Sequence, residues 1–490
     1  MRPARSRTIT ARTTTSPTWS APSWRRARPS TGGCIVWASC IERRGDSSPR
    51  KGGRAGDIFF VARRFIAAPE ESEAFMKIKS IESFPINMTF LPEVSPHMLR
   101  ALTHGTALAL CRVVLEDGAV GYGDSGGTDR SWVGRSALEA LRHCRDSGIQ
   151  MACYDAVGRS LDVPAHVLMG RQARARVPFA YWTIDLPPDL FAQQVRHAAS
   201  LGYTVYKFKC RPWWDPVEQV EAAARVAPPN FRAWLDFNGH LREARLALPI
   251  LKALSQYEFV GGFESPIPQR DVEGYKILRR KIDRPIAIHY GGGCCHVRSD
   301  PGYDPGVNAA VQIREELCDG FVLGGGDVDE LRQIAGVAHE FRKPFWIQTV
   351  GTALRAAWIA HLASTCQEAL LSSLAAHDLW VRDVTSVPRV TGGYLPVPEG
   401  PGLGVEVDEK AAAELRTAPP EPDIKRISTV VYPDGLRWHF ANELQRHEAF
   451  YFGDLPGFIR GVRLEVREDD GSRTFSELHS RCEKAPVVEG

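Results

Sequence analysis

The feature that most limits the possible folds is a regular alternation of short apolar runs and helical stretches between residues 176 and 412. The eight apolar runs are VPFAYW, TVYKFKC, RAWLDFN, VGGFESP, PIAIHYGGG, DGFVLGGG, PFWIQT and ALLSSLAAH. Stretches with helical spacing, such as DLFAQQVRHAASLGY and DELRQIAGVAHEF, separate them. Strands that alternate with helices pair in parallel, and eight such units predict an α/β fold of the closed (β/α)₈ type, a TIM-like barrel. A doubly wound open sheet has the same alternation, but no G-x-G-x-x-G motif follows the first strand.

The chain on either side of this region has a different pattern. Residues 76–175 hold three strand-like runs, KIKSIESFPI, ALALCRVVLEDG and VGYGDSGG, followed by a helical stretch, so they predict an N-terminal α+β domain. Residues 413–490 form a C-terminal extension, in which a Pro-Asp-Gly turn between two apolar runs predicts a hairpin. Residues 1–75 are rich in Arg, Ser, Thr and Pro, and their first acidic residue is Glu42. We expect them to be a disordered leader, such as a transit peptide, or the product of a start assigned upstream of Met76.

The composition excludes several classes of partner. The 490 residues suffice for about two to four domains, and the apolar content of 43% and charged content of 24% are those of a globular protein. Much of the net charge of +3 comes from the N-terminal segment, so neither nucleic acid nor a membrane surface is expected as a partner. No apolar run approaches the roughly 20 residues of a membrane span, and none of the 11 cysteines forms a C-x-x-C pair. A cytoplasmic protein with reduced cysteines is expected.

Polar residues end four of the predicted barrel strands. The second run ends in Lys207 and Lys209, which strand alternation places on one face. Asp236, Glu264 and His289 end the third, fourth and fifth runs, 28 and then 25 residues apart, which is close to one βα repeat each. Side chains at the C-terminal ends of barrel strands form the active site in this fold, and neighbouring strands lie about 4.8 Å apart. The last three side chains are therefore predicted to bind one divalent metal ion.

The expected metal is Mg²⁺, with Mn²⁺ or another divalent ion as the alternative. Carboxylate oxygens favour Mg²⁺ or Mn²⁺, whereas an imidazole ligand moves the preference toward Mn²⁺, Fe²⁺ or Zn²⁺. Unpaired carboxylates at the ends of apolar strands would be costly, which favours metal binding by Asp236 and Glu264. His289 could instead be a packed histidine or a residue that contacts substrate.

Taken in order, these motifs resemble those of a known enzyme family. The K-x-K, D-x-N, F-E-x-P and P-I-A elements, and the segment GYLPVPEGPGLGV at residues 393–405, are similar to those of the mandelate racemase and muconate lactonising family of the enolase superfamily. The similarity covers about residues 76 to 412. It implies an N-terminal α+β capping domain on a barrel, an essential divalent metal, a small-molecule carboxylate substrate and a homo-oligomeric enzyme.

The resemblance also implies roles for individual residues. In this family a base removes the proton α to the substrate carboxylate, and the metal stabilises the enediolate that forms. Lys209 corresponds to the base, with its pKa lowered by Lys207 and the metal, and Asn238 would orient the ligands and the substrate. Three further candidates for contact with substrate are His240 as general acid, Arg211 as a clamp for a carboxylate, and Gln348 as a hydrogen-bonding group. Each of these three has a purely structural alternative.

Three departures from the family pattern restrict the reaction. His289 stands where the family has Asp or Glu, Gln348 where racemases have a histidine, and Val322 where lactonising enzymes have a lysine. A second base on the opposite face of the substrate is therefore not expected, which disfavours two-base racemisation. We predict a hydro-lyase that dehydrates a hydroxy acid or acid sugar with one base, as the acid-sugar dehydratases of this family do. The alternatives are an isomerase (racemase, epimerase or cycloisomerase) and a non-catalytic binding or scaffold protein.

Overall fold

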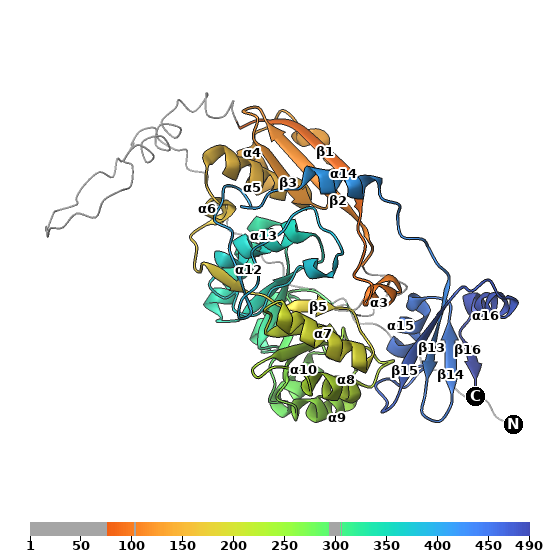
Figure 1. Ribbon diagram of the computed structural model, residues 1–490. Coiled ribbons are helices and arrows are strands. Elements are labelled where there is room, and N and C mark those ends of the chain that lie inside the picture. The colour runs from red at the N-terminus through yellow and green to blue at the C-terminus, as the bar shows by residue number, and fades with distance from the viewer. Residues whose placement is uncertain (1–75, 102–103, 294–303, 305) are drawn as a thin grey trace, which may run out of the picture. The chain divides into compact units, whose positions relative to one another are not determined.

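The computed structural model describes residues 76–101, 104–293, 304 and 306–490, which form the elements labelled in Figure 1. The predictions for residues 1–75 lie outside the described residues. In the described ranges, no helix has both the length and the apolar character that crossing a lipid bilayer requires.

The alternating region forms a seven-stranded sheet in the order β11-β10-β9-β8-β7-β6-β5, and all its neighbouring strands are parallel. The strands are β5 (Tyr181–Thr183), β6 (Val205–Lys209), β7 (Arg232–Asp236), β8 (Val260–Glu264), β9 (Ile286–His289), β10 (Gly320–Gly324) and β11 (Phe345–Gln348). The helices are α7 (Pro188–Ser200), α8 (Pro216–Ala224), α9 (Ala244–Ser255), α10 (Val272–Lys281), α11 (Ala309–Arg314), α12 (Val328–Glu340) and α13 (Ala353–Ser364). The α/β class predicted for this region is confirmed.

The eighth predicted run, ALLSSLAAH, is not a strand in the described structure. Ser373 bridges to Phe179, two residues before β5, and Leu374 bridges to Gln348 in β11, so single bridges lie next to both edge strands of the sheet. Ser373 Oγ accepts a hydrogen bond from Ile347 N at 3.1 Å, and a side chain thus takes a donor that a regular ladder would pair with backbone. The described sheet has seven strands, so the predicted closed barrel of eight strands is not confirmed.

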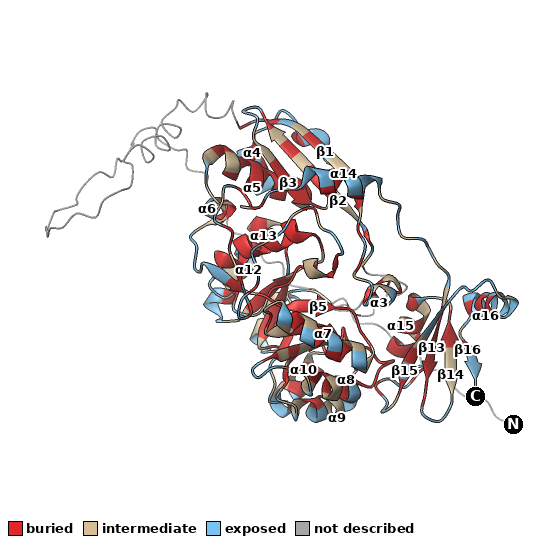
Figure 2. Ribbon diagram, viewed as in Figure 1, coloured by how far each residue is buried: buried red, intermediate tan, exposed pale blue. Residues whose placement is uncertain are grey.

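Alternate residues of the parallel strands share one side of the sheet and stack there in layers. Ala287, Val322 and Trp346 form one apolar layer, with Trp234 packed against it, and the sheet strands are buried along most of their length (Figure 2). A Cβ at Gly262 would lie 2.7 Å from the Trp234 ring, so a glycine is needed beside this indole. Asp236, His289 and Gln348 follow two positions after Trp234, Ala287 and Trp346 on β7, β9 and β11.

Residues 76–175 contain a three-stranded antiparallel sheet and several helices. The strands, in the order β1-β2-β3, are β1 (Ile78–Asn87), β2 (Ala107–Leu115) and β3 (Val120–Asp124). The helices are α3 (Ser95–Leu99), the 3-10 helix Arg130–Trp132, α4 (Ala137–His143), α5 (Ser147–Leu161) and α6 (Ala165–Met169). The long helical stretch expected after β3 is divided because Asp146 caps α5, where its carboxylate accepts from Gly148 N and Ile149 N.

Two carboxylates meet the N-terminus of α13, which follows β11. Asp124, at the end of β3, accepts hydrogen bonds from Thr352 N at 2.5 Å and Thr352 Oγ1 at 2.8 Å. Asp383 accepts from Ala353 N at 2.8 Å. The positive end of the helix dipole favours carboxylates at this position. Asp124 thereby ties the N-terminal sheet to the C-terminal edge of the parallel sheet. Between α13 and the extension lie the 3-10 helix His377–Leu379 and β12 (Tyr394–Pro396), which pairs with β4 (Arg176–Pro178).

The C-terminal extension forms a second antiparallel sheet in the order β15-β13-β14-β16. Helix α14 (Glu409–Thr417) precedes this sheet and contacts β1 of the N-terminal sheet. The elements that follow are β13 (Arg426–Val431), β14 (Arg437–Phe440), α15 (Glu443–Tyr451), β15 (Arg463–Glu468), α16 (Arg473–Lys484) and β16 (Val487–Glu489). Strands β13 and β14 pair across the turn at residues 433–435. The apolar core of the extension includes Trp213 and Trp214, which follow β6. The extension therefore packs directly on a loop at the C-terminal end of the parallel sheet.

The carboxyl group of Asp383 should make stability depend on pH. Burial, with a smaller effect of Asp124, raises the pKa of Asp383 to about 7, although hydrogen bonds from Ala353 N and Val384 N lower it. A carboxyl group whose pKa is higher in the folded state than its unfolded value of about 3.9 contributes stability below that value, which is lost as pH rises toward about 7. We predict that the melting temperature of Asp383→Asn, relative to the wild type, rises between about pH 4 and pH 7. A difference that is the same at every pH would contradict this.

Candidate active site

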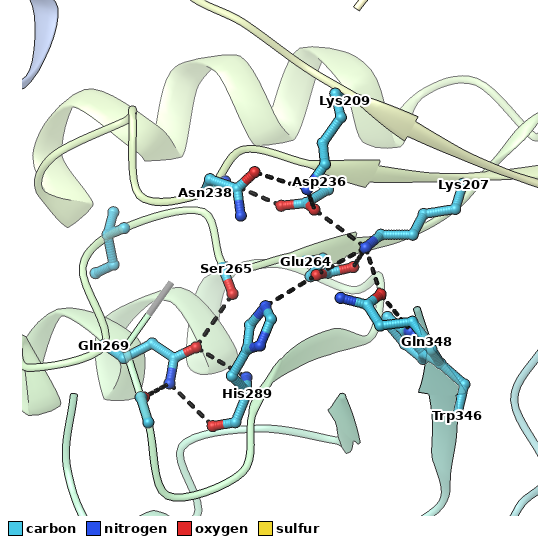
Figure 3. A network of polar contacts seen from close by, with 12 residues as sticks. Lys207, Lys209, Asp236, Asn238, Glu264, Ser265, Gln269, His289, Trp346 and Gln348 are labelled. Carbon is cyan, nitrogen blue, oxygen red and sulfur yellow. Dashed lines mark hydrogen bonds and ion pairs between the residues drawn. The ribbon is translucent and has the colours of Figure 1, made fainter. Parts of the chain in front are cut away.

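Four charged side chains converge at the ends of β6, β7 and β8 (Figure 3). Lys207 Nζ lies 2.9 Å from Glu264 Oε2 and 3.2 Å from Asp236 Oδ2, and Lys209 Nζ lies 2.6 Å from Asp236 Oδ2. All four are buried: the two carboxylate residues are 0% exposed, and the lysines are 3% and 6% exposed. The strand register brings them together, because Lys209 pairs with Asp236, and Asp236 pairs with Glu264. The structure therefore brings these four predicted residues together.

Asn238 and Arg211 extend this network beyond the strand ends. Lys209 Nζ and Arg211 Nη2 each donate to Asn238 Oδ1 at 2.9 Å. Asn238 N donates to Asp236 Oδ1 at 3.0 Å. Arg211 Nε is buried and has no hydrogen-bond partner among the described residues. Asn238 Oδ1 thus accepts hydrogen bonds from both Lys209 and Arg211. The Nε–H group of Arg211 can donate to another partner.

His289, at the end of β9, points its ring toward Glu264 (Figure 3). Its Nε2 lies 3.3 Å from Glu264 Oε1. Two buried glutamines hold its backbone: Gln269 Oε1 accepts from His289 N at 2.8 Å, and Gln312 Nε2 donates to His289 O at 2.8 Å. His289, the third predicted metal ligand, thus lies beside Glu264, the second. Glutamine side chains bond both the N–H and the carbonyl group of His289.

Gln348, at the end of β11, contacts the same network. Its Oε1 accepts from Lys207 Nζ at 2.5 Å and from Trp346 Nε1 at 2.9 Å. A side-chain amide cannot act as a base at neutral pH, so Gln348 serves here as a hydrogen-bond acceptor that orients the Lys207 ammonium. Val322, where the resemblance implied a lysine for lactonising enzymes, lies in the apolar layer beside Trp346.

His240 lies near the site but faces the C-terminal extension. Its Nδ1 is 2.7 Å from Phe237 O, and its Nε2 is 3.0 Å from His447 Nδ1 on α15. The ring of Tyr451 stacks on His240 with 4.1 Å between centroids. Both ring nitrogens are therefore engaged, and the general-acid role predicted for His240 requires one of these hydrogen bonds to break.

The charges of the network shift the pKa values of the two lysines in opposite directions. Burial, with the positive charges of Lys207 and Arg211, lowers the pKa of Lys209 to about 8, although Asp236 opposes this. Burial also acts to lower the pKa of Lys207, but Glu264 and Asp236 outweigh it and raise that pKa. Lys209 and Lys207 overcome the effect of burial on Asp236 and hold its pKa well below its usual range. Lys209 is therefore the lysine that can lose a proton, while Lys207 stays cationic.

The donor set suits a divalent cation, because it joins two buried carboxylates to an imidazole. Glu264 Oε2 and His289 Nε2 are buried and receive no hydrogen bond within the described part of the chain. Lys207 Nζ directs its hydrogen bond to Glu264 Oε1 at 3.0 Å and meets Oε2 as an ion pair only. Among the described residues, no three His, Cys, Asp or Glu side chains are close enough to hold a metal as they stand. The residue types therefore fit a metal, and binding one requires the Lys207 ammonium to move from between the carboxylates.

Several residues that build this site were not indicated by the sequence. Gln269 and Gln312 hold the backbone of His289, and His447 and Tyr451 contact the segment after β7 from α15. Gln269 follows Glu264 by five residues, so its place in the loop after a strand is a weak signal. Gln312 lies 23 residues after His289, and no motif marks it. His447 and Tyr451 lie more than about two hundred residues after their partners, and no motif connects them.

A family model described as Enolase C-terminal domain-like matches residues 190–291 and 322–411. The first of these ranges contains the two lysines, both carboxylates and His289.

Relatives with several different activities match this chain. An N-succinylamino acid racemase of Amycolatopsis sp is 29% identical over 221 residues, which are 44% of this chain and 56% of the racemase. A D-gluconate dehydratase of Thermoproteus tenax is 25% identical over 362 residues, or 64% of this chain and 70% of the dehydratase. A chloromuconate cycloisomerase of Cupriavidus pinatubonensis is 25% identical over 311 residues, or 58% of this chain and 79% of the cycloisomerase. The first of these alignments thus spans little more than half of the relative's length.

Two solved structures share the fold. N-succinyl Arg/Lys racemase from Bacillus cereus matches with a TM-score of 0.56 and 17% identity, over 70% of this chain and 99% of the racemase. An enolase from Thermobispora bispora, complexed with magnesium and formate, matches with a TM-score of 0.56 and 19% identity, over 70% of this chain and 92% of the enolase. The solved structures show a shared fold, and the family model and the relatives confirm the resemblance to the mandelate racemase and muconate lactonising family that the sequence motifs indicate.

Removal of Glu264 alone should cost more stability than removal of its ion pair with Lys207. Glu264→Leu leaves Lys207 buried with one carboxylate fewer, and breaking a buried ion pair costs about 3–5 kcal/mol. The double variant Lys207→Met/Glu264→Leu removes both charges, so it should be more stable than the single variant. Urea unfolding curves of the wild type and both variants measure this. A double variant no more stable than Glu264→Leu would contradict the charge balance described above.

Proposed function

We propose that this protein removes the proton α to the carboxylate of a small hydroxy acid, with Lys209 as the base. The observation that carries the proposal is the state of Lys209, a buried lysine whose pKa burial, Lys207 and Arg211 lower to about 8. A base works best when its pKa lies near the working pH, and a lysine in water would be almost fully protonated. The enzymes among the relatives support this class of reaction.

Lys207 and Arg211 would bind the carboxylate of the substrate. Lys207 stays cationic beside Glu264, and Arg211 has a buried Nε–H without a partner among the described residues. Negative charge develops on the carboxylate oxygens as the α-proton leaves, so cations fixed beside them stabilise the transition state more than the ground state. Gln348 would keep Lys207 oriented through the 2.5 Å hydrogen bond.

Asp236, Glu264 and His289 would hold a divalent cation, Mg²⁺ or Mn²⁺. When bound, such a cation supplies electrostatic stabilisation of the charge that develops on the carboxylate oxygens. The buried oxygen of Glu264 and the nitrogen of His289 that lack hydrogen bonds in the described chain support this assignment. A solved neighbour that is complexed with magnesium supports it as well.

Dehydration of a 2,3-dihydroxy acid, such as an acid sugar, is the reaction that we favour. Lys209 takes the α-proton, the protonated Lys209 returns it to the hydroxyl at the β-carbon, and that hydroxyl leaves as water. The enol that remains becomes a 2-oxo acid. This sequence needs one base, which agrees with Gln348 and Val322 at the positions of the second bases of the family. Relatives named as D-gluconate and D-galactonate dehydratases support it.

An isomerase is the second candidate. The alignments to an N-succinylamino acid racemase and a chloromuconate cycloisomerase favour this alternative. The two candidates differ in one observable, because an isomerase moves or exchanges the α-proton without loss of water from the substrate.

Exchange of the α-proton in D₂O should test the role of Lys209. With Mg²⁺ or Mn²⁺ present, we expect an acid-sugar panel to contain a substrate that gains α-deuterium or yields a 2-oxo acid, both visible by NMR. Lys209→Ala and Lys209→Arg should each lower the rate at least about 100-fold. Lys209→Arg is the matched control for charge, since a guanidinium keeps the positive charge beside Asp236 but does not act as a base.

Three outcomes would change the proposal. Full activity in either Lys209 variant would remove Lys209 as the base. Exchange without formation of a 2-oxo acid would favour the isomerase. No reaction of the wild type with any acid in the panel would favour a binding or scaffold protein.

Substitution of His289 should weaken metal binding. We predict that His289→Asn lowers the affinity for Mn²⁺ at least about tenfold, because it removes the imidazole ligand. Isothermal titration of the metal-free protein with Mn²⁺ measures the affinity. His339→Asn is the matched control, since His339 is an exposed histidine 3.2 Å from Glu368 and lies away from the site. Equal affinities of the two variants would contradict ligation by His289.

A further inference from the structure

Helix α15 of the C-terminal extension presents one face to the segment that follows β7. The residues of this face are spaced three or four apart, as one side of a helix requires: Glu443, Arg446, His447 and Tyr451. His447 Nδ1 lies 3.0 Å from His240 Nε2, and Arg446 lies over the Trp213 ring at 4.2 Å. The family model ends at residue 411, so this helix lies outside the range that the model matches.

The segment that α15 contacts has an unusual backbone. Asn238 has a φ of 44° and Gly239 a φ of 79°, so two consecutive residues are left-handed. A left-handed conformation costs a non-glycine residue about 1 kcal/mol or more, although asparagine tolerates it better than most. Tyr451 Oη donates to Asn238 O at 2.7 Å, and this hydrogen bond is buried. Tyr451 therefore holds the peptide group that joins these two left-handed residues.

Asn238 transmits this constraint to the candidate base. Its side-chain oxygen accepts from Lys209 Nζ and from Arg211 Nη2, each at 2.9 Å, and its N–H donates to Asp236 Oδ1 at 3.0 Å. The carbonyl group that Tyr451 holds, the side chain and the N–H group are joined at the Asn238 Cα, so a displacement of that Cα would move all three hydrogen bonds. Hydrogen bonds thus connect Tyr451 to Lys209 through Asn238.

A second anchor joins α15 to the same segment. His447 lies between His240 and Glu443, with its Nε2 3.1 Å from Glu443 Oε1. The three hydrogen bonds from Phe237 O through His240 and His447 to Glu443 need three protons, whereas two neutral imidazoles carry two. The third proton belongs to a histidine or to Glu443, and in the first case the bond to the carboxylate is charge-assisted and roughly twice as strong as a neutral one.

We propose that the C-terminal extension is part of the candidate active site, and that Tyr451 is a positioning residue that holds Asn238 and, through it, Lys209. The proposal rests on the proposed function for its kinetic consequence. Tyr451 donates a hydrogen bond to Asn238, and Asn238 accepts one from Lys209. A displacement of about 1 Å at a catalytic group can cost about 100-fold in rate, whereas one hydrogen bond contributes only about 1 kcal/mol to folding. Loss of the Tyr451 hydroxyl should therefore affect turnover more than stability.

Tyr432→Phe is a matched control for Tyr451→Phe. Tyr432 lies in the same extension, is 5% exposed compared with 2% for Tyr451, and donates its hydroxyl to Pro456 O at 2.9 Å. Each variant thus removes a hydrogen bond from a tyrosine hydroxyl to a backbone carbonyl, which is buried for Tyr451 and partly buried for Tyr432, and only one of these carbonyls belongs to Asn238.

The test compares the two full-length variants with the wild type. We expect Tyr451→Phe to lower kcat at least about tenfold with KM within about twofold, and Tyr432→Phe to leave both unchanged. Urea midpoints of the two variants should agree. Hydrogen–deuterium exchange should become faster in residues 236–242 of Tyr451→Phe alone, where Gly239 N donates to Ser265 O and His240 N donates to Phe237 O.

Unchanged kcat in Tyr451→Phe, or the same fall in both variants, would overturn the proposal. The exchange measurement needs no substrate, so it decides the structural part even if the wild type has no turnover. In that case faster exchange only in Tyr451→Phe supports the link from α15 to Asn238, while the absence of turnover counts against the proposed function. Equal exchange in both variants would overturn the link itself.

Discussion

The ion pairs of Lys207 with Asp236 and Glu264 are the interactions on which the rest of the site depends. Two carboxylates at the ends of adjacent strands, both fully buried, would repel each other and lose their hydration without a cation. Lys207 lies between them at 3.2 and 2.9 Å. The same interaction makes the two lysines different, because Lys207 is held by two carboxylates and stays charged. Lys209 pairs with one carboxylate and faces two cations, so its pKa falls to about 8 under burial and these charges.

The fold prepares this arrangement in two layers. The apolar layer of Ala287, Val322 and Trp346 lies two residues before the C-terminal ends of β9, β10 and β11. The charged residues form the next layer. Below the charges there is therefore little room for water, which strengthens the electrostatic interactions among them. Above the strand ends, α15 adds contacts to the segment after β7 that lie beyond the range of the family model. The site is thus built on a shared fold and supported by a segment of the chain outside the matched region.

The parts that could be predicted from the sequence are those with local patterns. Lys207, Lys209, Asp236, Glu264 and His289 end apolar runs at regular spacing, so their positions at strand ends followed from alternation and the βα repeat. The sequence predicted an eighth strand that the described structure does not contain. The side chain of Ser373 accepts the hydrogen bond from Ile347 N, so the segment forms single bridges in place of a regular ladder. The partners of His240 could not be predicted either, since His447 and Tyr451 come from a helix some two hundred residues away.

The central claim is that the carboxylates of Asp236 and Glu264 form a cation site in which Lys207 now supplies the charge. The most direct measurement is anomalous diffraction from a crystal of the protein grown with Mn²⁺. We predict one manganese peak bound by Asp236, Glu264 and the Nε2 atom of His289, with the ammonium of Lys207 displaced from between the carboxylates. Density for Lys207 in its described position, with no manganese peak at these three residues, would contradict the claim.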